Sequence, residues 1–298
     1  MKRARLWALQ ARYSPYLFVS PFVILFCTFL IYPLGRSLML GFYKTAGPRN
    51  QIFIGIENYL FLFRDELFWV AVGNTTLYVI MYLSIQIPAS LGLAMLLNSK
   101  FVHARSFFRF AFFSTHLVGQ VFVAVLFAQI LSVRGGLLNG LLSLLTGQLI
   151  QINWIGDPYL ARISLVIASL WLSVGFGMIY FLAALQAVDQ ELYEAADVDG
   201  AGKWARFMHI TIPGIKPVLL FMILVGTIGA FQLFELPWVL FQQSAGPANA
   251  GLTIVSYLYI AAFQGGDLGY ASAIGWMLVL IVLMIVATFR LLGFGKET

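Results

Sequence analysis

The chain has 298 residues, of which 61% are hydrophobic and only 10% are charged, and its formal net charge at pH 7 is +6. A water-soluble domain needs roughly a quarter of its residues charged, so the composition excludes an ordinary soluble protein and indicates a membrane protein. The basic residues stand in small groups beside apolar stretches, a pattern typical of membrane topology, which argues against nucleic acid as a partner.

Six apolar stretches are long enough to cross a hydrocarbon core of about 30 Å, which takes about 20 residues in a helix. The predicted spans are residues 17–38, 71–97, 109–132, 163–187, 217–241 and 271–292. Because lipid offers the backbone no hydrogen-bond partners, each span is expected to be helical. The sequence therefore predicts an all-α, polytopic bundle of about six transmembrane helices that forms one transmembrane domain over residues 1–298.

The N-terminal segment 1–16 carries four basic residues before the first span, which is also how a secretory signal begins. The apolar run that follows is longer than the core of a signal peptide, and it leads into Tyr32, Pro33 and Arg36. An uncleaved first helix is therefore the preferred interpretation. The single cysteine, Cys27, lies inside this span and excludes an intramolecular disulfide.

The distribution of lysine and arginine predicts the orientation in the membrane. Twelve of the 18 fall in the N-terminus, the C-terminus and the segments 98–109 and 188–216, and six fall in the segments on the other side. Cytoplasmic segments carry the excess of basic residues, so both termini are predicted to lie in the cytoplasm. The segments 133–162 and 242–270 are then predicted to lie outside.

The cytoplasmic segment 188–216 predicts two short helices joined at glycine. The first helix has an apolar side and a separate acidic face, where carboxylates recur every three residues. Gly200 and Gly202 can supply the positive φ of a sharp turn. Pro213 and Pro217 are expected to end the second helix and to begin the fifth span. Such a hairpin suits docking into a groove on another protein, and an ordinary solvated loop is the alternative.

The residues of this hairpin resemble a known motif. Glu194-Ala195-Ala196, then Gly200, then nine residues and Ile210-Thr211-Ile212-Pro213 are similar to the EAA motif of bacterial ABC importer permeases. Asp199-Gly200-Ala201 resembles the form that carbohydrate permeases have. In that family the hairpin is the coupling helix, which sits in a cleft of a cytoplasmic ATPase. The resemblance implies these coupling contacts: Glu194, Ala195, Ala196, Asp199, Gly200, Ala201, Ile210 and Pro213.

The resemblance covers nearly the whole chain. The run from Tyr16 to Pro21 is similar to the start of the first permease of sugar and glycerol-phosphate importers, and Phe234 to Leu240 resembles the carbohydrate-type fifth helix. It implies a permease subunit of an ATP-driven, binding-protein-dependent importer for a sugar, an oligosaccharide or glycerol phosphate. It also implies a bacterial or archaeal cytoplasmic membrane as the location. The implied partners are a second homologous permease, two copies of an ATPase, an extracytoplasmic solute-binding protein and the lipid bilayer.

The chain is not expected to be an enzyme. The phosphate-binding pattern G-x-x-x-x-G-K-[ST] occurs nowhere in the sequence, so ATP is expected to be used by the partner ATPase, with no cofactor bound by this chain. His103, His116 and His209 are far apart and lack metal-ligand spacing. No catalytic residue and no metal site are predicted.

Polar residues inside the spans are costly and usually face a cavity or another helix. Gln232 and Glu235 lie three residues apart and are expected to share one helical face, where they would line the solute path beside Phe231 and Trp238. The alternative places Glu235 at the outer interface and Gln232 against another helix. The amides in the other spans are expected to hydrogen-bond between helices: Asn74, Gln86 and Gln129.

A self-sufficient carrier or channel is the second function class. Such a protein needs its own coupling residues, and Glu235 has no intramembrane partner for a proton relay. Carriers are also often built from paired repeats, and no clear repeat is found here.

Overall fold

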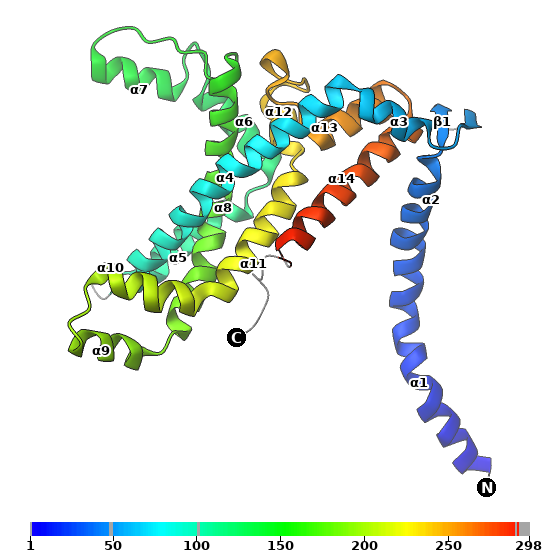
Figure 1. Cartoon of the computed structure of the whole chain (residues 1–298), viewed down its shortest axis with the longest axis horizontal. Coiled ribbons are helices and arrows are strands. Elements are labelled where there is room, and N and C mark those ends of the chain that lie inside the picture. Colours follow the sequence, from blue (N-terminus) through cyan, green and yellow to red (C-terminus); the bar gives the residue numbers. More distant parts are fainter. Residues whose placement is uncertain (1, 48–49, 100–101, 290, 292–298) are drawn as a thin grey trace. The chain divides into compact units, whose positions relative to one another are not determined.

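The computed structural model describes residues 2–47, 50–99, 102–289 and 291 (Figure 1). Their contacts divide the chain into two compact units. Unit 1 comprises Met1–Asp65 with Leu258–Met277, and unit 2 comprises Glu66–Tyr257 with Leu278–Thr298. The single domain over 1–298 stays a prediction.

Unit 1 begins with one helical run and continues into a small hairpin. The run consists of α1 (Lys2–Phe26), the π-helical turn η1 (Cys27–Ile31) and α2 (Tyr32–Leu40). The strands β1 (Tyr43–Ala46) and β2 (Asn50–Phe53) then pair antiparallel, with Tyr43 opposite Phe53. This hairpin is a small departure from the all-helical prediction. The remaining elements of unit 1 are α3 (Glu57–Arg64), the π-helical turn η5 (Ile260–Gln264) and the first part of α14 (Leu268–Phe289).

Buried polar contacts hold unit 1 together. The Asp267 carboxylate, just before α14, accepts hydrogen bonds from the backbone N and the hydroxyl of Thr45 in β1, at 3.3 and 3.1 Å. The Asn58 amide donates to the carbonyl oxygens of Gly41 and Tyr43, both at 2.9 Å. These bonds satisfy backbone groups that the short strands leave unpaired, and they fix the β-hairpin to the start of α14.

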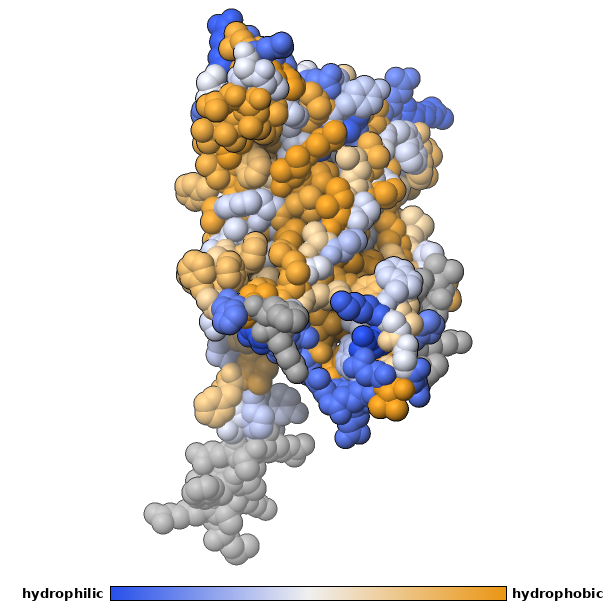
Figure 2. Space-filling model, turned by 90° about the vertical axis from the view of Figure 1, so that its left-hand side faces the viewer, coloured by the Kyte–Doolittle hydropathy of each residue, from blue (hydrophilic) through white to orange (hydrophobic). Residues whose placement is uncertain are grey.

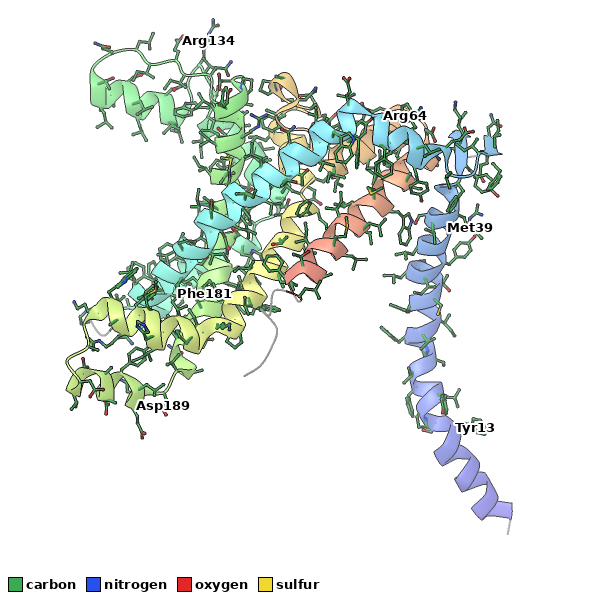
Figure 3. The ribbon with its side chains drawn as sticks, in the orientation of Figure 1. Tyr13, Met39, Arg64, Arg134, Phe181 and Asp189 are labelled. Atoms are coloured by element: carbon green, nitrogen blue, oxygen red, sulfur yellow. The ribbon has the colours of Figure 1, made fainter. Side chains whose placement is uncertain are left out.

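The core of unit 2 is formed by three long helices: α4 (Glu66–Asn98), α8 (Pro158–Ala187) and α11 (Ile212–Phe231). Figure 1 shows α4 and α8 side by side along most of their length. Their facing sides are apolar, and Phe181, labelled in Figure 3, is fully buried among them. The buried cluster consists of Leu91, Ala94, Leu97, Met178, Phe181, Leu182, Ala184, Leu185, Ile215 and Met222.

Shorter elements complete unit 2. They are α5 (Arg105–Ser114), the 3-10 turn η2 (Thr115–Leu117), α6 (Gln120–Ile130), α7 (Leu137–Thr146), α9 (Gln190–Val198), α10 (Lys203–Arg206), the π-helical turn η3 (Phe207–Thr211), α12 (Glu235–Leu240), the 3-10 turn η4 (Pro247–Asn249) and α13 (Ile254–Tyr259), whose last two residues belong to unit 1. In Figure 1, α7 and α12 lie at one end of this unit and the α9–α10 hairpin lies at the other. Figure 3 labels Arg134 and Asp189 at these opposite ends.

Five single helical runs are long and apolar enough to cross a membrane, and each overlaps one of the predicted spans. They are Tyr13–Leu40, Glu66–Asn98, Pro158–Ala187, Lys203–Phe231 and Leu268–Phe289. Positions 290 and 292 of the predicted sixth span lie outside the described residues. On the face drawn in Figure 2, hydrophobic residues cover a broad middle zone and hydrophilic residues gather toward both ends, as expected for helices that cross a bilayer.

The prediction of one continuous third helix over 109–132 is wrong. The chain forms Arg105–Leu117 and Gln120–Ile130, which are bent by 98° from each other and together can make a sixth span. The break lies at Val118 and Gly119, where ψ is 131° and 144° and the backbone is extended rather than helical.

The prediction of one fifth helix over 217–241 is also wrong. Helix α11 ends at Phe231, Leu233 and Phe234 are not helical, and α12 begins at Glu235. Pro237 explains the restart. In an uninterrupted helix its ring would clash with the carbonyl of Leu233, whereas in the first turn of α12 its missing N–H costs nothing.

Candidate functional site

The hairpin of α9 and α10 is closed by backbone geometry at its tip. Gly200 has φ +74°, and the backbone N of Ala201 donates to the carbonyl of Ala196 at 2.8 Å. The N–H of Gly200 itself donates to the carbonyl of Asp197 at 3.2 Å. This pair of bonds is the usual way a helix ends at a left-handed glycine. The predicted turn at Gly200 is therefore present, but Gly202 has φ −66° and supplies no left-handed turn.

Two side-chain contacts join the arms of the hairpin. The Tyr193 hydroxyl lies 3.0 Å from the hydroxyl of Thr211, which is buried. Arg206 forms an ion pair with Asp197. At the start of α9, the Asp189 carboxylate accepts from the backbone N of Glu191 at 3.0 Å. The hairpin is thus a braced structural element and not a loose loop.

The outer surface of the hairpin combines apolar and acidic groups. Val198, Trp204 and Leu192 are 90%, 70% and 53% exposed, and the carboxylates of Glu191 and Glu194 are exposed too. Large apolar side chains exposed together mark a surface that another protein or a membrane covers.

The structure places the predicted coupling residues on both arms of the hairpin. Those on α9 and its tip are exposed or half-buried: Glu194, Ala195, Ala196, Asp199, Gly200 and Ala201. Ile210, half-buried, and Pro213, exposed, follow on the second arm. Whether these residues contact an ATPase stays a prediction.

The second arm does not end at the prolines, contrary to the prediction. Residues Lys203–Phe231 form one helical run through α10, η3 and α11. Pro213 falls in the first turn of α11, directly after η3, where the N–H of Ile212 bonds to the carbonyl of Phe207, five residues back. This wider turn accommodates the missing N–H of Pro213. The hairpin is therefore continuous with a core helix.

The upper part of that helix borders a cavity of about 450 Å³. The walls come from α4, α8, α11, the break between α5 and α6, and the α11–α12 junction with the start of α12, all within unit 2. They are formed by Tyr78, Tyr82, Gln86, His116, Leu117, Val118, Gly119, Gln120, Ser169, Leu172, Ser173, Phe176, Met222, Val225, Gly226, Gly229, Ala230, Leu233 and Leu236. The volume is in the range of small-molecule sites, which combine mostly apolar walls with a few convergent polar groups.

Gln86 is the most informative polar residue of this cavity. Its side chain is only 2% exposed, and its Nε2 donates to the Ser90 hydroxyl at 3.2 Å. Its Oε1 is buried and has no hydrogen-bond partner among the described residues. A buried polar atom without a partner is costly, and a bound solute or a water can satisfy it. The prediction that Gln86 bonds between helices does not hold, because Ser90 is on the same helix.

Other polar and aromatic groups surround the cavity in pairs. Tyr78 and Tyr82 on α4 and Ser169 and Ser173 on α8 all line the cavity and bring four hydroxyl groups to it. The rings of His116 and Phe176, which also line the cavity, stack with centroids 4.5 Å apart. Hydroxyl groups beside a flat aromatic surface can bind a polyhydroxylated solute, because the hydroxyls replace water and the ring covers the C–H face.

The structure places the four predicted path residues in two different environments. Gln232 follows the end of α11 and Glu235 begins α12, so the premise of one shared helical face is wrong. Both are exposed, whereas Phe231 and Trp238 are 2% and 9% exposed and pack inside the unit. None of the four lines the cavity. Their role in the solute path stays a prediction.

Sequence reasoning missed most of the cavity. One signal was available: Tyr78, Tyr82 and Gln86 recur every four residues and form a polar stripe on an apolar helix, and Ser169 and Ser173 repeat the same spacing. Within the described ranges, no group of three or more His, Cys, Asp or Glu side chains is placed to hold a metal ion.

Comparison with known proteins identifies the family. The family described as "binding-protein-dependent transport system inner membrane component" matches residues 67–293. This chain belongs to that family. Among its relatives is the arabinooligosaccharides transport system permease protein AraP of Bacillus subtilis, 36% identical over 272 residues that cover 91% of this chain and 86% of AraP. The lactose transport system permease protein LacF of Rhizobium radiobacter is 36% identical over 269 residues, which cover 90% and 89% of the two chains.

A solved structure supports the same conclusion. A chain of a bacterial ABC transporter involved in the import of the acidic polysaccharide alginate matches with a TM-score of 0.81 and 27% identity, covering 97% of this chain and 98% of that one. The permease subunit is thus a multi-pass membrane protein and a transport component of the ABC importer type, as the hairpin motif predicts. A second match is that transporter in complex with its alginate pentasaccharide-bound periplasmic protein, also with a TM-score of 0.81.

Proposed function

We propose that this permease subunit carries an oligosaccharide across the cytoplasmic membrane by alternating access, and that a separate ATPase drives it through the α9–α10 hairpin. The observation that carries the proposal is the unbroken helical run Lys203–Phe231, which begins in the hairpin and ends at the cavity wall. A displacement of the hairpin by a partner would move that wall directly, because a helix transmits force along its axis without unfolding.

In the assembled transporter, different subunits would bind the solute, hydrolyse ATP and form the path through the membrane. The exposed apolar and acidic groups of the hairpin suit a groove on an ATPase, two copies of which would serve this chain and a second permease. A solute-binding protein would deliver the sugar on the opposite side, as the alginate transporter and its periplasmic protein suggest by analogy. The ATP would be bound and hydrolysed by the ATPase, and this chain would hold no cofactor.

The hairpin provides a sharp test with a matched control. Gly200→Val places a β-branched residue at φ +74°, whereas Gly202→Val places the same residue at φ −66°, and a Cβ at either position meets no atom within 4 Å. The first change costs about 1–3 kcal/mol of local strain, and the second does not. In proteoliposomes of the assembled transporter, Gly200→Val should lower ATP-driven uptake strongly while Gly202→Val transports normally. Equal uptake by both variants would contradict coupling through this hairpin.

We further propose that both termini and the hairpin lie in the cytoplasm. The basic residues favour this orientation, and within unit 2 α7 and α12 lie at the end opposite the hairpin (Figure 1). In a Cys27→Ala background, a cysteine at Ser244 should react with an impermeant thiol reagent added to intact cells. A cysteine at Lys203 should not, and its labelling would overturn the orientation.

A further inference from the structure

Helix α7 presents an unpartnered leucine face. Four leucines at helical spacing and one that follows the helix are exposed: Leu137 66%, Leu141 60%, Leu144 82%, Leu145 81% and Leu149 83%. The helix is ten residues long, about 15 Å, so it is too short to span a bilayer. An apolar face of this size is not stable against water and needs a cover.

On the opposite side of α7, polar side chains hydrogen-bond to the loop that follows the helix. The Asn139 side chain is 3% exposed and donates to the carbonyl of Ile152 at 2.9 Å, while its Oδ1 accepts from the indole N–H of Trp154 at 3.0 Å. The Ser143 hydroxyl accepts from the backbone N of Ile150 at 2.8 Å. The leucine face is therefore held outward by a rigid base, and the helix cannot turn it inward without breaking these bonds.

The same bonds fix α7 at the level where the spans end. The Asn139 amide also donates to the carbonyls of Ser132 and Val133, which follow α6. The backbone carbonyl of Trp154 accepts a hydrogen bond from the Ser164 hydroxyl of α8. Only six residues separate α6 from α7, so the helix begins within about 25 Å of the end of α6. In Figure 1, α7 projects sideways from this end of unit 2.

The chemistry of the face selects lipid over protein. Residues 135–156 contain no charged side chain, and the large exposed side chains of α7 are all leucines. A surface that a soluble protein visits and leaves carries a polar rim, whereas a surface always covered by acyl chains needs none. The apolar surface also continues from α6, where Phe122, Val125 and Leu126 are 74%, 51% and 46% exposed. Figure 2, which looks onto the side from which α7 projects, shows a hydrophobic area near the end of the molecule.

We propose that α7 is an interfacial helix whose leucine face lies in the acyl boundary of the leaflet opposite the hairpin. There it anchors the α6–α8 connection, and with it the wall of the cavity that α6 and α8 adjoin. This lipid contact does not depend on which solute the transporter carries.

The test uses the assembled transporter in proteoliposomes with a Cys27→Ala background. An environment-sensitive fluorophore is attached at Leu144→Cys on the leucine face, and at Gln148→Cys as the control on an exposed polar residue of the same loop. Lipids with a nitroxide on the acyl chain report contact with the hydrocarbon boundary. We expect blue-shifted emission at position 144 and about twofold stronger quenching there than at position 148.

Two results would overturn the proposal. Water-like emission without quenching at position 144 would mean that the face is not in the bilayer. Blue-shifted emission that nitroxide lipids fail to quench, or quenching that disappears when the solute-binding protein is added, would mean that a protein covers the face instead.

Discussion

The hairpin and the cavity belong to the same unit and are built in opposite ways. The hairpin is convex and exposed, and its bonds join residues close in the sequence, such as Tyr193 and Thr211, 18 positions apart. The cavity is concave, and its walls come from elements far apart in the sequence, from α4 to α12, that only the folded unit brings together. Under the proposed function, partner binding would depend on a local motif, whereas solute binding would depend on the packing of the whole unit. Mutations in the hairpin should therefore affect mainly coupling to the partner, whereas mutations around the cavity should also change the stability of unit 2.

The largest effect should follow from disturbing the packing behind the cavity. A Cβ on Gly175 of α8 would lie 1.8 Å from the carbonyl oxygen of Phe112, so α5 can pack here only against a glycine. Gly175→Ala should lower the free energy of unfolding by about 3 kcal/mol, because two backbones must separate. Gly92→Ala in α4, where a Cβ meets nothing within 4 Å, should stabilise the helix by about 0.5–1 kcal/mol.

The measurement is the thermal denaturation midpoint of the purified transporter for both variants. Midpoints that agree within error would mean that α5 and α8 do not depend on this close approach. The cavity wall would then be less tightly specified than the structure indicates.

The next effect separates solute binding from stability. Gln86→Leu removes a buried carbonyl oxygen that has no partner among the described residues, together with one hydrogen bond from Nε2 to Ser90, so the free energy of unfolding should fall by no more than about 1.5 kcal/mol. Loss of one hydrogen bond to the solute, about 0.5–1.5 kcal/mol, should lower the apparent affinity for uptake about 2- to 10-fold. Uptake kinetics and denaturation are measured on the same preparation.

Asn74→Leu is the matched control. The Asn74 amide donates to the carbonyl of Asn249 at 2.7 Å and its Oδ1 accepts from Arg162 at 3.1 Å, so its bonds are made within the protein. Its loss should destabilise by about 1–3 kcal/mol. If Gln86→Leu destabilises as much as Asn74→Leu and leaves the uptake affinity unchanged, Gln86 is structural and the cavity is not the solute site.

The same contrast explains what the sequence could predict. The hairpin is encoded by adjacent residues, so the glycine turn at Gly200 and the acidic face of α9 followed from spacing alone. Long apolar spans were equally accessible, because the period and length of a helix are local properties. The positions where two of the spans break could not be predicted in this way. Pro237 restarts a helix rather than continuing it, and the bend at Gly119 depends on packing that no single segment contains.

The cavity could be predicted least. Ser169 and Ser173 acquire a meaning only when α8 packs against α4 and places them beside Tyr78 and Tyr82. Gln232 and Glu235 attracted attention because they are polar within an apolar stretch, yet the structure places both on the exposed surface of the chain. Composition along one segment predicts that a polar group needs a partner, but not which partner it finds.

A smaller effect is therefore expected at those two residues. Gln232→Ala and Glu235→Gln remove groups that can face a second subunit or the solute on its way, but not the cavity. Each should lower uptake by roughly twofold, less than Gln86→Leu does, because an exposed hydrogen bond contributes little. Transport in proteoliposomes decides the order. A larger loss from Gln232→Ala than from Gln86→Leu would move the solute path from the cavity to this surface.

The smallest effect is expected at the ion pair that joins the arms of the hairpin. The Asp197 side chain is 61% exposed and that of Arg206 is 24% exposed, so solvent and salt screen their attraction. Asp197→Asn should cost at most about 1 kcal/mol and leave uptake nearly unchanged, because the glycine turn and the Tyr193–Thr211 contact still close the hairpin. Uptake is compared with the parent at low and high salt. A large loss at low salt that disappears at high salt would show that uptake depends on the charge of Asp197, acting through Arg206 or through the partner ATPase. A large loss at both salt concentrations would mean that the hairpin is held mainly by this pair, and local backbone geometry would no longer account for its rigidity.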